Sequence, residues 1–401
     1  MATAELSFAC IELTAPFLSA AHFFPAGASA GCFGLGYRRP SCAMAAASAP
    51  RVPRKLRFGS DFSGIDGWLV GLRRLGINYT HEFSSDIEPS ARKLIQAAHK
   101  PNQLFENVLD RLHDDAVYTD VYTWSPPCQD FSSAGKMKGL AGTRDIGNLV
   151  KKSIMYIKRR RPRLTIMENV ASLASHKKFK PIERGITTTL QALNYKVFTK
   201  VLDSHHYGSP AHRRRYYLVA IRGDSLRRAF KWPKQLAVSA RITMFDVLEP
   251  LSDTDKPGRL PTHKREKGHA LSAFRAAWKE GVDATSTPVI VDIDGSPNFK
   301  AWGIRVAGTL TRKRGQSGGP WVSCRGRRTT LWELMAMQGF VHTDLPWEEA
   351  GVSRAQIGGM LGNSVHVGTV GHLLAEALFA SGIALKKPLY AQPALPYLDT
   401  N

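Results

Sequence analysis

Cysteine is scarce in this sequence, and long apolar runs are missing from it. The five cysteines are widely separated and form no Cys-x-x-Cys pair, which argues against a disulfide framework and against a structural zinc site. No stretch reaches the roughly 18 consecutive apolar residues that a membrane-spanning helix needs. We therefore expect no bound metal and no membrane-spanning segment.

Acidic residues are also few. The chain has 33 Asp and Glu against 55 Lys and Arg, so its 401 residues carry a formal net charge of +22. This excess indicates a polyanionic partner, either nucleic acid or an anionic membrane surface, and charge alone does not choose between them. Hydrophobic residues make up 43% of the chain, which is enough for a sizeable core. The length suggests two or three units at roughly 150 residues per domain.

The positive charge is unevenly distributed. Residues 1–50 hold two arginines and two glutamates, so the whole +22 lies in residues 51–401. This Ala- and Ser-rich segment is predicted to be either a disordered tail, with translation starting at Met44, or an organellar targeting segment. Residues 224–327 are polar and carry 19 basic and 10 acidic residues, a net +9. The predicted division is a tail (1–50), a main domain (51–223), an inserted module (224–327), a return to the main domain (328–380) and a second tail (381–401).

Strand and helix patterns alternate through the main domain. Apolar segments that are typical of strands occur at 56–58, 79–85, 117–123 and 164–167, with helical spacing between them. Two more strands are predicted near 195–202 and 215–221. Alternation at this spacing predicts an α/β fold with a doubly wound, mostly parallel sheet and helices on both of its faces.

Small and acidic residues follow the first two predicted strands. The turn 61–67 contains Gly64, and small residues there let the backbone approach a ligand at the start of a helix. Asp86 follows the second strand, where doubly wound folds place a carboxylate for ribose hydroxyls. The full Gly-x-Gly-x-x-Gly pattern is missing, so a plain tight turn is the ordinary alternative.

Three further groups lie beside predicted strands. Cys128 follows the third strand in a loop stiffened by two prolines, and Glu168 follows the fourth strand directly. Arg213 and Arg215 lie at the start of an apolar strand. Because successive side chains of a strand point to opposite faces, these two arginines are expected on the same face. Two guanidinium groups on one side suit phosphate or carboxylate binding. Each group also has an ordinary interpretation. Cys128 could be a buried apolar residue, Glu168 a helix-capping acid, and the arginines a solvent-exposed run of charge.

The order of these motifs resembles the cytosine-C5 DNA methyltransferase family. The resemblance covers about 51–380 and implies a Rossmann-like methyltransferase fold with an inserted target-recognition domain at 224–327. It implies methyl transfer from S-adenosylmethionine to C5 of cytosine in double-stranded DNA. A monomer is sufficient for this chemistry and is the expected state. The matching segments are Phe62-Ser-Gly64, Pro126-Pro127-Cys128-Gln129, Glu168-Asn169-Val170, Arg213-x-Arg215, Thr330-Leu-Trp-Glu333, Gln338-Gly339-Phe340 and Gly362-Asn363-Ser364-Val365.

The resemblance implies a role for each matching position. Cys128 would add to C6 of a flipped-out cytosine, Glu168 would contact N3, and Arg215 would help to hold the activated base. Arg213, in the same motif, is counted with these catalytic residues. The cofactor pocket would comprise Phe62, Ser63, Gly64, Ile65, Asp86, Ile87, Asn107, Val108, Pro127, Leu149, Asn363, Ser364 and Val365. The DNA contacts would include Gln129, Ser132 and Lys136 in the Gly- and Lys-rich loop after the third predicted strand, and Arg312, Lys313 and Arg314 in the insert.

Three positions depart from the family pattern. Asp66 stands where the family usually has its second glycine. Asn107 stands where an acid usually contacts the adenine amino group, and an amide oxygen accepts more weakly than a carboxylate. Ala211 replaces the usual glutamine before the arginine motif. None of the three affects the predicted catalytic residues.

Other functions share parts of this pattern. A zinc cytosine deaminase needs a second cysteine three residues after the first, and Phe131 stands there instead. A tRNA-methylating branch of the same family and a non-catalytic DNA-binding paralogue stay as alternatives. The expected compartment is the nucleus, which suits DNA and the basic run 158–161. A plastid or mitochondrion is the alternative if residues 1–50 are a targeting segment.

Overall fold

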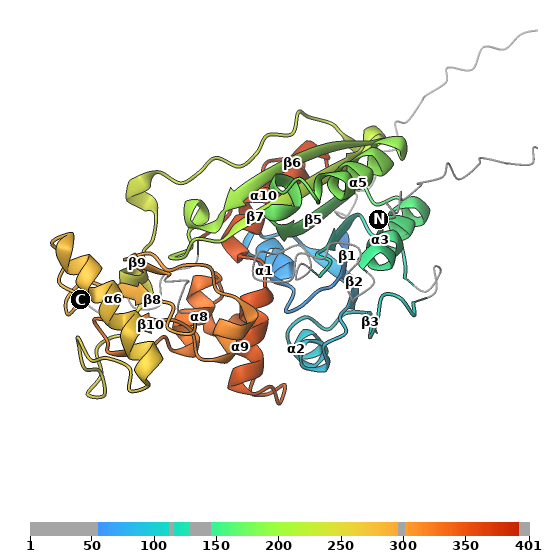
Figure 1. Cartoon of the computed structure of the whole chain (residues 1–401). Coiled ribbons are helices and arrows are strands. Elements are labelled where there is room, and N and C mark those ends of the chain that lie inside the picture. Colours follow the sequence, from blue (N-terminus) through green and yellow to red (C-terminus); the bar gives the residue numbers. More distant parts are fainter. Residues whose placement is uncertain (1–54, 112–115, 128–145, 296–300, 393–401) are drawn as a thin grey trace, which may run out of the picture. The chain divides into compact units, whose positions relative to one another are not determined.

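A computed structural model describes residues 55–111, 116–127, 146–295 and 301–392. Its main sheet has seven strands in the order β3-β2-β1-β4-β5-β7-β6 (Figure 1). Neighbouring strands are parallel except at β7, which runs antiparallel to both β5 and β6. The prediction of a mostly parallel α/β sheet is confirmed. The strands are β1 (Leu56–Asp61), β2 (Tyr79–Ser85), β3 (Gln103–Phe105), β4 (Val121–Trp124), β5 (Leu164–Val170), β6 (Tyr195–Asp203) and β7 (Arg214–Arg222).

Helices cover both faces of this sheet because its strands are apolar on both sides. Along β7, Tyr217 and Val219 join the core formed with α1 (Gly67–Arg74) and α10 (Val367–Ala380). The alternate residue Leu218 joins the core formed with α3 (Ile146–Arg160) and α5 (Lys180–Ala192). Two further helices, α2 (Pro89–His99) and α4 (Ser172–Ser175), follow β2 and β5.

A second, antiparallel sheet lies within residues 289–328. Its strand order is β11-β10-β8-β9, and α6 (Lys264–Lys279) packs Ala270, Ala273 and Ala277 onto it. Its last strand spans the predicted boundary at 327, and the division into domains stays a prediction. The strands are β8 (Val289–Val291), β9 (Trp302–Ile304), β10 (Trp321–Val322) and β11 (Arg327–Arg328).

Three helices lie between β9 and α10. The first, α7 (Arg312–Gln316), separates β9 from β10, and α8 (Leu331–Met337) and α9 (Arg354–Asn363) lead from β11 to α10. Thr330 and Glu333 form a capping box at the start of α8, in which each side chain accepts the other's backbone N–H. Single turns of 3₁₀ helix occur at Ser204–Tyr207, Gly223–Ser225, Val238–Ala240, Met244–Val247 and His342–Asp344. The helix α9 was not predicted, and its end positions Asn363 at the site described next.

Candidate active site

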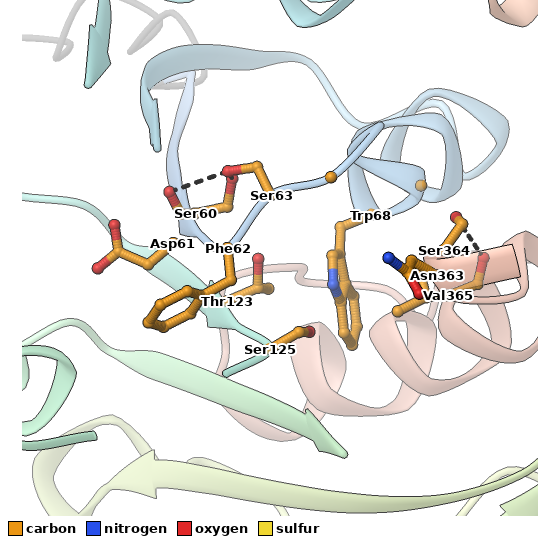
Figure 2. Close-up of a pocket in the computed structure, with 12 residues that line it drawn as sticks. Ser60, Asp61, Phe62, Ser63, Trp68, Thr123, Ser125, Asn363, Ser364 and Val365 are labelled. Carbon is orange, nitrogen blue, oxygen red and sulfur yellow. Dashed lines mark hydrogen bonds between the residues drawn. The ribbon is translucent and has the colours of Figure 1, made fainter. Parts of the chain in front are cut away.

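A cavity opens at the carboxyl ends of β1 and β4, where doubly wound sheets bind their ligands (Figure 2). The space among its lining residues, together with the part that is open to solvent, is about 350 Å³. Six of the residues predicted to bind a cofactor line it: Phe62, Ser63, Gly64, Asn363, Ser364 and Val365. Segments about 300 residues apart in the sequence therefore meet at one site, because α9 and α10 pack beside α1 and the main sheet.

The turn between β1 and α1 is fixed by Asp86. Gly64 N–H donates to Asp86 Oδ2 at 2.7 Å, and Glu88 N–H donates to Oδ1 at 2.9 Å. Burial raises the pKa of this carboxyl group above its ordinary value. Each carboxylate oxygen has a further lone pair, so Asp86 can still accept a ribose hydroxyl beside the cavity.

The other predicted cofactor residues do not line the cavity itself. Ile65, Val108 and Leu149 are buried, whereas Ile87 leaves 77% of its surface exposed. The oxygen of the Asn107 side chain accepts the backbone N–H of Leu109 at 3.0 Å. Pro127 is partly exposed in the segment that follows β4. Their roles stay predictions.

Six residues that line the cavity were not predicted as site residues: Ser60, Asp61, Gly67, Trp68, Thr123 and Ser125. Asp61 is buried and accepts both guanidinium nitrogens of Arg111, at 2.6 and 2.8 Å. It also accepts the hydroxyl groups of Tyr122 and Ser85, each at 2.6 Å. Its position at a strand end was a usable signal, but nothing local pointed to Arg111.

Glu168 and Arg215 face each other from neighbouring strands. Arg215 Nε lies 3.2 Å from Glu168 Oε1, and the glutamate is 7% exposed. Burial raises the pKa of the Glu168 carboxyl group, although the charges of Arg215 and Arg213 act against this. A carboxyl group in such surroundings holds its proton to higher pH than an exposed glutamate does.

The next residue ties this pair to the cysteine loop. Asn169 Nδ2 donates to the carbonyl oxygen of Pro126 at 3.0 Å, in a buried contact. β4 and β5 are paired there, with Trp124 opposite Met167. The Pro126-Pro127 segment therefore leaves the sheet directly beside Glu168. Cys128, Gln129, Ser132 and Lys136 lie outside the described residues.

Arg213 makes different contacts from Arg215. Its Nη1 donates to the carbonyl oxygens of Leu310 and Gly362, at 3.0 and 3.2 Å. It therefore ties the start of β7 to the segments before α7 and at the end of α9. Its charge also acts on Glu168, so the pair of arginines shares one electrostatic environment.

The predicted DNA-binding residues of the insert lie on α7. Arg312 pairs with Glu88 at 2.7 Å, and Arg314 pairs with Asp292. Lys313 is exposed. In the described ranges, no three His, Cys, Asp or Glu side chains gather in positions that could bind a metal. Within those same ranges, every helix is too short or too polar to cross a membrane.

Comparison with known sequences decides the family. Residues 56–379 match the C-5 cytosine-specific DNA methylase family. The chain belongs to this family. The type II methyltransferase M.NlaX of Neisseria lactamica is 30% identical over 192 residues, which are 48% of this chain and 59% of that protein. M.HaeII of Haemophilus aegyptius is 26% identical over 350 residues, covering 84% of this chain and 97% of that protein.

A solved structure has a similar fold. The Entamoeba histolytica methyltransferase EhMeth superposes with a TM-score of 0.55 at 18% identity, over 81% of this chain and 98% of that one. This likeness supports the Rossmann-like arrangement alone and carries no information about the substrate. The chain spans about three fifths of the length of M.NlaX.

Proposed function

We propose that this chain transfers a methyl group from S-adenosylmethionine to C5 of cytosine in double-stranded DNA. The observation that carries the proposal is the arrangement at the ends of β4 and β5. There the Glu168–Arg215 pair and the Pro126 carbonyl, held by Asn169, adjoin the residues that lead to Cys128. Family membership over 56–379 supports the same reaction.

The cavity fits the proposed cofactor. It combines an aromatic ring, Phe62, with hydroxyl groups, the mixture of apolar and polar lining that is typical of small-molecule sites. Thr123 Oγ1 is buried there and has no hydrogen-bond partner among the described residues, which leaves it available to a polar ligand. Asp86 offers a carboxylate next to Gly64. When bound, S-adenosylmethionine supplies an electrophilic methyl group on a sulfonium.

Cys128 is proposed to make cytosine reactive. C5 of cytosine is a poor nucleophile, and a thiolate that adds to C6 makes it enamine-like. Glu168, with its raised pKa, can hydrogen-bond or protonate N3 and so spread the charge that develops. C5 then takes the methyl group, a base removes the remaining C5 proton, and the electron pair released expels the Cys128 thiolate from C6. Because the target atom is inaccessible inside a duplex, we propose that the base is flipped out, at a cost of a few kcal/mol.

A methyl-transfer assay tests this function. The protein is incubated with S-adenosylmethionine labelled in its methyl group and, in parallel, with duplex DNA or with tRNA. We expect label in the DNA, at cytosine C5 after digestion to nucleosides. Label in tRNA alone would assign the chain to the tRNA-methylating branch. Label in neither, despite DNA binding, would identify a non-catalytic DNA-binding protein.

The helix α7 gives a prediction about DNA affinity. Replacing Arg312, Lys313 and Arg314 together by alanine should weaken DNA binding. It should also make the fall of the logarithm of the binding constant with the logarithm of salt concentration less steep, by about one for each phosphate that the protein no longer neutralises. Lys313 alone should account for one such phosphate, since both arginines already have carboxylate partners. Fluorescence anisotropy over a salt series measures this, with Lys279→Ala on α6 as the control. A slope that the triple variant leaves unchanged would remove α7 from the interface.

A further inference from the structure

A buried chain of hydroxyl groups runs from the cavity wall to Asp66. Asp66 has φ 50°, a left-handed conformation that suits glycine, and its side chain is buried. Its Oδ2 accepts hydrogen bonds from Ser60 at 2.7 Å and Ser84 at 3.0 Å. Ser60 Oγ lies 2.7 Å from Ser63 Oγ, and both serines line the cavity (Figure 2). A carboxyl group at a glycine position therefore reaches the cavity through two hydroxyl groups.

The direction of these hydrogen bonds depends on one proton. An ionised Asp66 can only accept, so Ser60 donates to it and in turn accepts from Ser63. The Ser63 oxygen also accepts the backbone N–H of Ser85 at 3.2 Å, which leaves one lone pair for the cavity. A protonated Asp66 can donate to Ser60, which then donates to Ser63. The Ser63 proton is in that case free to point at the cavity or at the carbonyl oxygens of Ser60 and Ser85, each 3.2 Å away.

We propose that Asp66 is a positioning residue whose ionised form makes the cavity prefer the sulfonium-bearing cofactor over its neutral sulfide product. This rests on the function proposed above. S-adenosylmethionine carries a positive sulfonium, whereas S-adenosylhomocysteine, which is left after transfer, has an uncharged sulfur. A carboxylate behind the wall attracts the cation, and the lone pair of Ser63 acts in the same direction. Protonation of Asp66 removes both effects and so favours retention of the product.

The Asp66 carboxyl group changes its charge at a pH that a binding experiment can cover. Burial raises the pKa of Asp66 to about 6, against hydrogen bonds from Ser60 and Ser84 and the charge of Arg73, which lower it. On β2, His81 Nε2 lies 3.9 Å from Asp66 Oδ2, and burial lowers the pKa of this histidine to about 4.

The remaining groups around Asp66 keep their charge between about pH 5 and about pH 7.5. Burial lowers the pKa of His99 on α2 to about 3, and burial raises the pKa of Tyr79 on β2. Arg73 on α1 is a permanent cation. Asp86 is the exception near the cavity, because burial raises its pKa as well, so a test must separate it from Asp66.

Ligand affinities measured by calorimetry separate the contribution of Asp66 from that of Asp86. Binding of S-adenosylmethionine and of S-adenosylhomocysteine is measured on the full chain from about pH 5 to about pH 7.5. In the wild type, affinity for the sulfonium ligand should rise roughly fivefold as pH passes the pKa of Asp66, and affinity for the sulfide much less. Asp66→Asn keeps the left-handed backbone, and its amide can donate to Ser60 as the protonated acid does. In Asp66→Asn, we expect the ratio of the affinities for the sulfonium and sulfide ligands to stay at the wild type's low-pH value across the whole range.

Two controls accompany this comparison. Asp253→Asn changes an exposed carboxylate in the insert and should leave the wild-type profile intact. Ser60→Ala breaks the hydroxyl chain and should reduce the preference at neutral pH. Any pH dependence that Asp66→Asn retains belongs to Asp86. The wild-type comparison of the two ligands needs no variant, so parallel profiles there overturn the proposal even if a variant fails to fold.

The proposal is overturned if both ligands follow parallel pH profiles in the wild type, or if Asp66→Asn behaves as the wild type does. In either case intact binding of the sulfonium ligand would leave the proposed methyl transfer standing. If neither ligand binds the wild type at any pH, both proposals are overturned.

Discussion

Replacing Cys128 with alanine should lower methyl transfer to DNA by roughly four orders of magnitude or more, because removal of a covalent nucleophile leaves only binding and positioning. DNA binding itself should change little. Single-turnover transfer of labelled methyl groups measures the first effect, and a gel shift measures the second. If Cys128→Ala transferred methyl groups as fast as the wild type, the covalent mechanism would be wrong.

Cys324 provides the matched control for this substitution. It is a buried, free cysteine near the second sheet, and burial raises the pKa of its thiol, which keeps it neutral and unreactive. Cys324→Ala should therefore retain transfer. DNA that carries 5-fluorocytosine gives an independent readout, since no C5 proton is available to expel the cysteine. The wild type, and not Cys128→Ala, should form a complex with it that survives denaturing electrophoresis.

Residues at strand ends were the part of this site that sequence reasoning could place. Parallel strands present their carboxyl ends at one edge, so a residue that directly follows an apolar strand is placed once the strand is recognised. Gly64 was predicted in this way and Phe62 from the family resemblance, and the structure puts both on the cavity wall. Glu168 was predicted likewise, and it lies beside Arg215.

The helix α9 could not be predicted from local pattern. Gly358, Gly359 and Gly362 are poor helix formers and leave it without a clear apolar stripe. The structure requires them, because α7 approaches so closely that a Cβ at Gly362 would lie 2.3 Å from the Thr311 carbonyl group. Packing with a segment far along the chain overrides local preference at this point, and the cavity depends on it for Asn363.

Contacts between distant segments set the rest of the site. Arg111 pairs with Asp61 from 50 residues away in the sequence, and no sequence motif predicts this ion pair. The alternation of β7 correctly separates Arg214 from its neighbours, but it says nothing about the carbonyl groups of Leu310 and Gly362 that hold Arg213. Such partners depend on the arrangement of α9 and the insert, which is tertiary information.

Glu168→Gln should slow methyl transfer by about two orders of magnitude or more, in the range typical of general acid catalysis, and leave DNA affinity unchanged. The amide keeps the size of the side chain and can still contact N3, but it cannot deliver a proton. Single-turnover kinetics at saturating DNA and cofactor isolates this step from product release. Unchanged single-turnover rates would show that Glu168 has no part in activating the base.

The pH profile distinguishes this role from a merely structural one. Because burial raises the pKa of Glu168, the wild-type rate should fall with rising pH as this group loses its proton, at higher pH than for an ordinary glutamate. Glu168→Gln should lack this falling limb of the profile. The charge of Arg215 lowers the pKa of Glu168, so Arg215→Met should move the limb to higher pH. Glu82→Gln is the matched control, since Glu82 is a buried carboxylate on the same sheet that pairs with Arg57 at 2.9 Å. This variant should keep both the rate and the limb, because its carboxylate lies away from the ends of β4 and β5.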